Sequence, residues 1–220
     1  PNDASSSYWG GALSIAREVY QLPNGDLATR LDPYLSMLLN KGLIYEMGQD
    51  ITGVYGTMTS AEGSVTLAGT ETRYDFANLA EARVPGNYQR IIVDYVLSIA
   101  DLDAKAGIIL KNEQLATRHF VIIDRATSTL SVYSRTPMGN ATRSSIAMQI
   151  DDYENIEIKV IVDGSIVDVY VNGTYSLAAR VTTKGVQELD NIALSLFASG
   201  SATFTDLQIS KLASAETVFE

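Results

Sequence analysis

Residues 84 to 212 form a succession of short apolar segments separated by turn residues, and this pattern restricts the chain to an all-β fold. Within residues 155–163, Ile156, Ile158 and Val160 alternate with polar side chains, which is the period of a strand with one buried face. No convincing amphipathic helix separates the segments, so the crossovers that parallel strands require are lacking. The sequence therefore predicts a two-sheet, mainly antiparallel β-sandwich with strands at 90–101, 105–111, 119–135, 155–163, 165–181, 191–200 and 201–212.

Turn signals join several of these segments to their neighbours. Asn172-Gly173 suits both positions of a type I′ hairpin turn, and residues 163–165 and 124–129 predict two further reversals. By contrast, residues 78–90 carry the strand-breaking pair Pro85-Gly86 and a mixed pattern. We expect this last segment to be a loop on the rim of the sandwich.

The composition excludes several classes of function. The net charge is −10, and Lys and Arg do not cluster with aromatic residues, so nucleic acid and anionic membranes are poor partners. There is no cysteine and there is one histidine, which argues against disulfides, Cys-ligated zinc, a Ser-His-Asp triad and a multi-histidine metal site. We expect no metal and no cofactor. No apolar run approaches eighteen residues, and no signal-peptide pattern begins this sequence. Side-chain hydrolysis would have to rely on carboxylates.

The first forty-four residues differ from the rest. Residues 8–31 predict two strands around an Asn24-Gly25 turn, and a short helical turn is expected around 34–40. Two strands and a turn leave one face uncovered, so this piece is not expected to fold alone.

Two stretches resemble glycoside hydrolase family 32. The segment YWGGALSIAREVYQLPNGDLATRL (8–31) resembles the end of that family's catalytic domain, with Ala16 where proline is usual. The matching positions are Trp9, Gly11, Ala12, Leu13, Ile15, Arg17 and Glu18. IVDGSIVDVYVNG (161–173) and LSLFASGSATFTDLQISKL (194–212) resemble the last strands of the family's C-terminal sandwich.

The resemblance implies a division of the chain into the closing segment of a five-bladed β-propeller and linker, residues 1–44, and a concanavalin-like jelly-roll sandwich, residues 45–220. In this family the propeller carries the catalytic carboxylates, and the enzymes hydrolyse or transfer β-linked fructosyl units of sucrose, inulin or levan. The propeller's three carboxylate motifs are absent here. The chain is thus expected to be the non-catalytic C-terminal part of a secreted β-fructofuranosidase or fructosyltransferase, with the propeller as its partner, sucrose or fructan as a ligand, and homodimerisation as a further expectation.

Asp163 and Asp168 are the two carboxylates set among the valines of residues 161–171. Because they are five residues apart, strand alternation predicts that they point to opposite faces, so they are not expected to form a catalytic pair. Asp163 is expected to shape the turn. Asp168 is expected to meet a basic neighbour or, as the alternative, to bind substrate.

The remaining candidate residues each have a structural and a functional interpretation. Trp9 either packs the seam between the two parts or stacks on a sugar ring. Arg17 and Glu18 are expected to face opposite ways, with at least one in an ion pair across the interdomain seam. Asn140 and Asn172 head glycosylation sequons on predicted turns.

Two rival functions remain open at this level. One is a free-standing fructan-binding module, against which the Trp9 to Glu18 segment argues, since a pure binding module needs no closing propeller strand. The other is an intact small glycosidase, against which the lack of convergent carboxylates argues.

Overall fold

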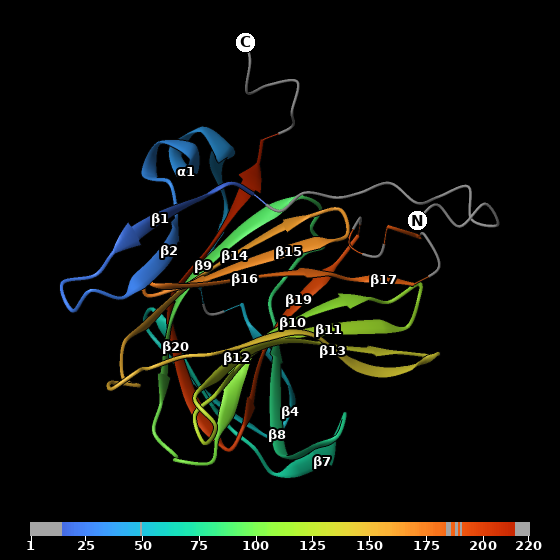
Figure 1. Ribbon diagram of the computed structural model, residues 1–220. Helices are drawn as coiled ribbons and strands as arrows, with labels where there is room; N and C mark the ends of the chain where they lie inside the picture. Colours follow the sequence, from blue (N-terminus) through green and yellow to red (C-terminus); the bar gives the residue numbers. More distant parts are fainter. Residues whose placement is uncertain (1–14, 49, 184–185, 188, 190, 214–220) are drawn as a thin grey trace.

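The computed structural model describes residues 15–48, 50–183, 186–187, 189 and 191–213, and Figure 1 shows them as two packed sheets with a small hairpin and helix at one side. Each sheet has eight strands, and every strand pair in the two sheets is antiparallel. The predicted two-sheet antiparallel sandwich is confirmed. No helix in this described part of the chain is long and apolar enough to cross a membrane.

We name the two layers sheet I and sheet II. Sheet I runs in the order β13-β12-β11-β10-β19-β8-β4, with β7 paired to β8. Its strands are β4 (Thr52–Tyr55), β7 (Glu71–Arg73), β8 (Phe76–Arg83), β10 (Lys105–Asn112), β11 (Thr117–Asp124), β12 (Thr129–Thr136), β13 (Gly139–Ala147) and β19 (Ala193–Ser199).

Sheet II runs in the order β16-β15-β14-β9-β20-β6-β5, with β3 paired to β20. Its strands are β3 (Asn40–Glu46), β5 (Thr57–Ala61), β6 (Ser64–Ala68), β9 (Ile91–Ile99), β14 (Ile156–Asp163), β15 (Ile166–Val171), β16 (Tyr175–Arg180) and β20 (Ser201–Leu212). A separate two-stranded pair is formed by β17 (Thr182–Thr183) and β18 (Val186–Gln187).

The core lies between the sheets and follows the alternation seen in the sequence. Ile156, Ile158 and Val160 of β14 are buried in this core, as their spacing predicted. Side chains of this size stabilise the fold by about 1.5–3 kcal/mol each when fully buried. A second, smaller cluster lies on the outer face of sheet II and includes Ile161 and Tyr170. Outward-facing residues of sheet II, such as Ile161 and Tyr170, are therefore apolar where the N-terminal segment packs on them.

Two late strands occupy central places in the sheets. β19 lies between β10 and β8, and β20 lies between β9 and β6. The turns that join β11 to β12, β14 to β15 and β15 to β16 were predicted, whereas β13 was not. The insertions of β19 and β20 join segments about a hundred residues apart in the chain.

The predicted rim loop at 78–90 is wrong over its first half. Residues 76–83 form β8, which pairs with both β19 and β4, and only the part around Pro85-Gly86 is irregular. The mixed pattern arises because Glu81 points to the outer face and is fully buried there, where the Lys111 ammonium donates to its carboxylate. Buried charged residues are rare unless they are paired, so a charged residue within a strand reads as a break in the apolar pattern when its partner lies on another strand.

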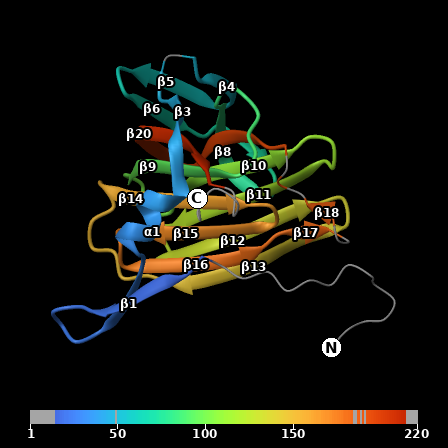
Figure 2. The same cartoon turned by 90° about the horizontal axis from the view of Figure 1, so that it is seen from above.

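The N-terminal part forms a hairpin and a helix on the outer face of sheet II. β1 (Arg17–Gln21) and β2 (Leu27–Leu31) pair around the predicted Asn24-Gly25 turn. Helix α1 (Pro33–Leu39) follows, with the Asp32 carboxylate accepting from Leu35 N at 2.9 Å as its N-cap. Figure 2 shows α1 over β14 and β15, with β1 beside β16. The predicted division at residue 44 falls within β3, which pairs with β20.

Candidate functional site

The hairpin is attached to the sandwich through a buried ion pair between Arg17 and Asp168. Arg17 Nη2 of β1 donates to Asp168 Oδ1 of β15 at 2.7 Å, and Ile15 N donates to Oδ2 at 3.2 Å. The Asp168 side chain is 1% exposed and that of Arg17 22%. Burial raises the pKa of Asp168, while the Ile15 amide and the Arg17 guanidinium act in the opposite direction. Two residues singled out in the sequence are thus direct partners.

Glu18 and Arg30 form a second, more exposed pair. Arg30 Nε donates to Glu18 Oε2 at 2.8 Å, which connects β1 to β2 within the hairpin. The hydrogen bond and charge of Glu18 raise the pKa of Arg30. Arg30 also lies over the Tyr20 ring at 4.6 Å from its centroid. Arg17 and Glu18 therefore face different partners, and Arg17 is the one whose partner belongs to the sandwich.

Further contacts hold the hairpin against the edge of sheet II. Thr29 Oγ1 and Ser176 Oγ are 2.6 Å apart, and Tyr20 Oη donates to the carbonyl of Gly173 at 2.7 Å. Leu31 packs with Tyr170 and the other members of the small outer cluster. The hairpin is therefore attached to sheet II by an ion pair, by side-chain hydrogen bonds and by apolar contacts.

The expectation that Asp163 and Asp168 point to opposite faces is wrong. Asp168 lies opposite Ile161 and Asp163 opposite Ile166, so both carboxylates lie on the outer face of sheet II. Residues an odd number apart point to opposite faces only when they lie on one strand. The two-residue turn at Gly164 pairs Asp163 with Ile166, so these two residues share a face and the alternation starts again on β15. Each carboxylate has its own cation, since Arg90 Nη1 is 3.2 Å from Asp163 Oδ1.

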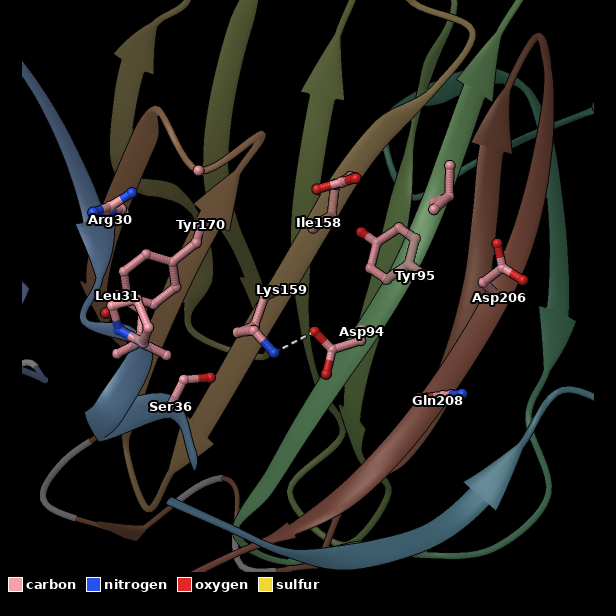
Figure 3. Close-up of a pocket in the computed structure, with 14 residues that line it drawn as sticks. Arg30, Leu31, Ser36, Asp94, Tyr95, Ile158, Lys159, Tyr170, Asp206 and Gln208 are labelled. Atoms are coloured by element: carbon pink, nitrogen blue, oxygen red, sulfur yellow. Dashed lines mark hydrogen bonds and ion pairs between the residues drawn. The ribbon is translucent and has the colours of Figure 1, made fainter. Parts of the chain in front are cut away.

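A groove of about 550 Å³ runs along the outer face of sheet II beside the hairpin. Figure 3 shows Arg30 and Leu31 at one side of it and Asp206 and Gln208 at the other. Between them Lys159 of β14 donates to Asp94 of β9. These residues carry no motif that predicted a groove. The one usable signal was that Lys159 lies on the face of β14 opposite the core-facing residues.

The other predicted site residues lie apart from this groove or outside the described part. Trp9 lies outside the described residues. Asn172 occupies a turn with a φ of 51°, and its Oδ1 accepts from Glu157 N at 2.8 Å. Asn140 is exposed but belongs to β13 rather than to the turn before it, and its Nδ2 donates to Asp75 Oδ2 at 2.8 Å. Within the described ranges no three His, Asp or Glu side chains gather in a way that would hold a metal ion.

The outer face of sheet I carries an aromatic cluster that was not predicted from the sequence. Phe120 packs against Phe76 at 5.2 Å and against Phe197 at 5.4 Å between ring centroids, with Tyr74 and Tyr133 at the margin. The spacing of Phe120 and Ile122 on β11 indicates a second apolar face. It does not predict the cluster, because the rings come from four different strands and a turn.

Comparisons with known proteins agree with this fold. The chain matches the family described as "Glycosyl hydrolases family 32 C terminal" over residues 59–211. No curated protein sequence matches the chain.

Solved structures of similar fold include a carbohydrate-binding module and a protein of unknown function. The carbohydrate-binding module CBM66 from Bacillus subtilis has a TM-score of 0.57 at 13% identity, covering 73% of this chain and 95% of that one. A Bacillus subtilis protein of unknown function with a galectin-like fold has a TM-score of 0.63 at 12% identity, with coverages of 79% and 98%.

A fructosyltransferase from A. japonicus has a TM-score of 0.56 at 14% identity, covering 90% of this chain and 32% of that one. The present chain thus spans about a third of the length of that enzyme. At such identities the likenesses show the shared fold, whereas the family match covers more than half of the chain. The chain belongs to glycosyl hydrolase family 32, as the C-terminal β-sandwich of that family.

Proposed function

We propose that this sandwich is the non-catalytic part of a secreted β-fructofuranosidase or fructosyltransferase, and that it supports the catalytic propeller of the same enzyme. The observation that carries the proposal is the β1–β2 hairpin, which belongs to neither sheet and is held to sheet II by the Arg17–Asp168 pair. Residues 15–39 would then be the closing part of the propeller and its linker, and the sandwich would begin with β3.

Exposed apolar side chains in this region support docking to a larger body. Val19 and Leu27 of the hairpin are 62% and 74% exposed, and Tyr34 and Met37 of α1 are 66% and 65% exposed. None of the helix residues is buried. A two-stranded hairpin with apolar side chains open to water is marginal by itself, because half of its surface lacks a partner. Pairing of this hairpin with the preceding propeller strands would cover that surface.

Catalysis by the sandwich itself is disfavoured by its carboxylates. Asp163 and Asp168 share a face but are each paired to arginine, and Asp168 is almost fully buried. A glycosidase needs one carboxyl group able to act as acid and another free to attack or to activate water, both facing a cleft.

The proposal is tested on material from the native source. An antibody against this chain should capture, from the culture medium, a polypeptide larger than 23.8 kDa or a second chain bound to it, and that fraction should release fructose from sucrose, inulin or levan. The purified 220-residue chain should release none above buffer. A native protein of 23.8 kDa that occurs alone, or turnover by the isolated chain, would overturn the proposal.

A second candidate is a free-standing fructan-binding module. The likeness to CBM66, which covers 95% of that module, favours it. The same capture experiment separates the two, because a free-standing module would be recovered without a fructosidase.

A further inference from the structure

A second pocket, of about 240 Å³, lies on the outer face of sheet I, on the other side of the sandwich from the hairpin. Its floor is formed by Ile122 and Ser131, which are side by side on β11 and β12. Asp75 and Phe76, at the turn between β7 and β8, form one wall. Figure 1 shows β7 and β8 at the bottom of the molecule, with the hairpin and α1 at the top. A propeller docked at the hairpin would leave this pocket on the far side.

The turn that forms the wall has an unusual backbone. Tyr74 and Asp75 have φ values of 53° and 71°, in the left-handed region, at both positions of a two-residue hairpin turn. Such turns favour Asn-Gly or Asp-Gly, and a residue as bulky as tyrosine is uncommon there. Non-glycine residues in this region are concentrated at binding sites, where surrounding contacts hold the backbone in place.

The surrounding contacts hold both residues of this turn. The Tyr74 ring packs between Phe120, at 6.0 Å between centroids, and the Arg118 guanidinium, at 4.8 Å from the ring centroid. Asp75 Oδ2 accepts from Tyr133 Oη at 3.0 Å and from Asn140 Nδ2 at 2.8 Å. Both bonds go to the same oxygen, so Asp75 Oδ1 has no donor among the described residues. The two bonds therefore hold in place the carboxylate of Asp75, which lines the pocket.

The end of β11 supplies a second carboxylate with a fixed position to the pocket lining. Asp124 is 10% exposed, accepts from Lys105 Nζ at 2.8 Å, and also accepts from Thr127 N at 3.3 Å. The Phe76 and Tyr133 rings are 6.2 Å apart and nearly perpendicular, which gives the pocket an apolar side. Fixed acceptors beside an aromatic surface match a sugar ring, whose hydroxyl groups donate hydrogen bonds and whose C–H groups pack on a ring face. Two carboxylates against one ammonium disfavour an anionic ligand.

We propose that this pocket binds a single neutral sugar ring through Asp75, Asp124 and the Phe76–Tyr133 aromatic pair. Its identification as a terminal fructosyl unit rests on the function proposed above, whereas sugar binding itself rests on the pocket. The sandwich would then hold the end of a fructan chain on the face that the propeller leaves open.

The test measures binding of fructose, sucrose, short levan chains and glucose to the purified chain by NMR chemical-shift changes. Asp75→Gly removes the carboxylate while keeping a residue that the turn favours, and Tyr133→Phe removes one hydroxyl while keeping the ring. Asp75→Gly should weaken fructoside binding by at least about tenfold, and Tyr133→Phe by about threefold or more. Asp94→Asn makes a matched change of charge in the groove on sheet II and should leave binding unchanged.

The outcomes separate the two proposals. Binding lost in Asp75→Gly but kept in Asp94→Asn supports the pocket, whichever sugar binds. Glucose binding as well as fructosides would overturn the fructosyl assignment and keep the sugar site. No binding of any sugar at high millimolar concentration, or loss only in Asp94→Asn, would overturn the proposal. The propeller-supporting function is tested independently by the capture experiment.

Discussion

Arg17 and Asp168 are 151 positions apart in the chain and 2.7 Å apart in the structure, and their ion pair joins the N-terminal hairpin to sheet II. Ile15 N completes the set of donors around the carboxylate. A buried carboxylate is tolerated only where donors compensate for the water that it has lost. The pair therefore makes the position of the hairpin part of the stability of the sandwich.

Replacing Asp168 by Asn should destabilise the chain because a half-buried guanidinium would then face a neutral amide. We expect a loss of about 1–3 kcal/mol in the free energy of unfolding. Glu18→Gln is the matched control, since the side chains of its pair with Arg30 are 38% and 42% exposed and its loss should change the free energy of unfolding far less. Urea unfolding of both variants measures this, and equal losses would contradict the importance assigned to the buried pair.

Removing the cation should give a loss that depends on pH. Burial already raises the pKa of Asp168 in the folded chain, and Arg17→Ala removes contacts that oppose this rise. A carboxyl group with a raised folded pKa binds more protons when folded, so its contribution to stability falls as pH rises from about 4. The deficit of Arg17→Ala relative to the unmodified chain should be small near pH 4 and reach about 2–3 kcal/mol at pH 7.

Denaturant unfolding of both proteins across this range is the measurement for that pH dependence. A deficit that stays constant from pH 4 to pH 7 would show that the Asp168 charge is not what Arg17 compensates.

Tyr95→Phe should stabilise the chain or leave it unchanged. The Tyr95 side chain is buried in the core beside Phe204, and its hydroxyl has no hydrogen-bond partner among the described residues. Removing an unsatisfied buried hydroxyl should gain up to about 1 kcal/mol. Tyr153→Phe is the comparison, because Tyr153 Oη donates to Ser128 Oγ at 3.0 Å and its loss should cost about 1 kcal/mol. In thermal unfolding, Tyr95→Phe should melt at or above the temperature of the parent chain, and Tyr153→Phe should melt below it.

The exposed side chains of the hairpin should make the isolated chain bind a hydrophobic dye or self-associate. Val19 and Leu27 are both more than half exposed and lie on one small hairpin. The double substitution Val19→Asp and Leu27→Asp should reduce dye fluorescence and shift sedimentation toward the monomer. Leu102→Asp removes an equally exposed leucine, at 74%, from a turn elsewhere and should change neither. A parent chain that is monomeric and does not bind the dye would contradict the docking surface.

Most of the strands were predictable because alternation is local. Ile156, Ile158 and Val160 alternate with polar residues along β14, and Asn172-Gly173 marks the turn between the next two strands, β15 and β16. The segment at 78–83 was missed because Glu81 is buried with Lys111, which lies thirty residues further along the chain. The apolar and polar pattern of one strand does not predict that a charged residue is buried when its partner lies on a neighbouring strand.

The sequence alone determined the class of fold, the hairpin turns at Asn24-Gly25, 124–129, 163–165 and Asn172-Gly173, the short helical segment after residue 32 and the family that the chain resembles. The tertiary structure decided which strands are central, because β19 and β20 are inserted between strands formed much earlier in the chain. It also decided that Asp163 and Asp168 share a face and that Arg17 neutralises one of them. The physical reason is that alternation depends on the residues of one strand, whereas register and ion pairing depend on which distant strand lies beside it.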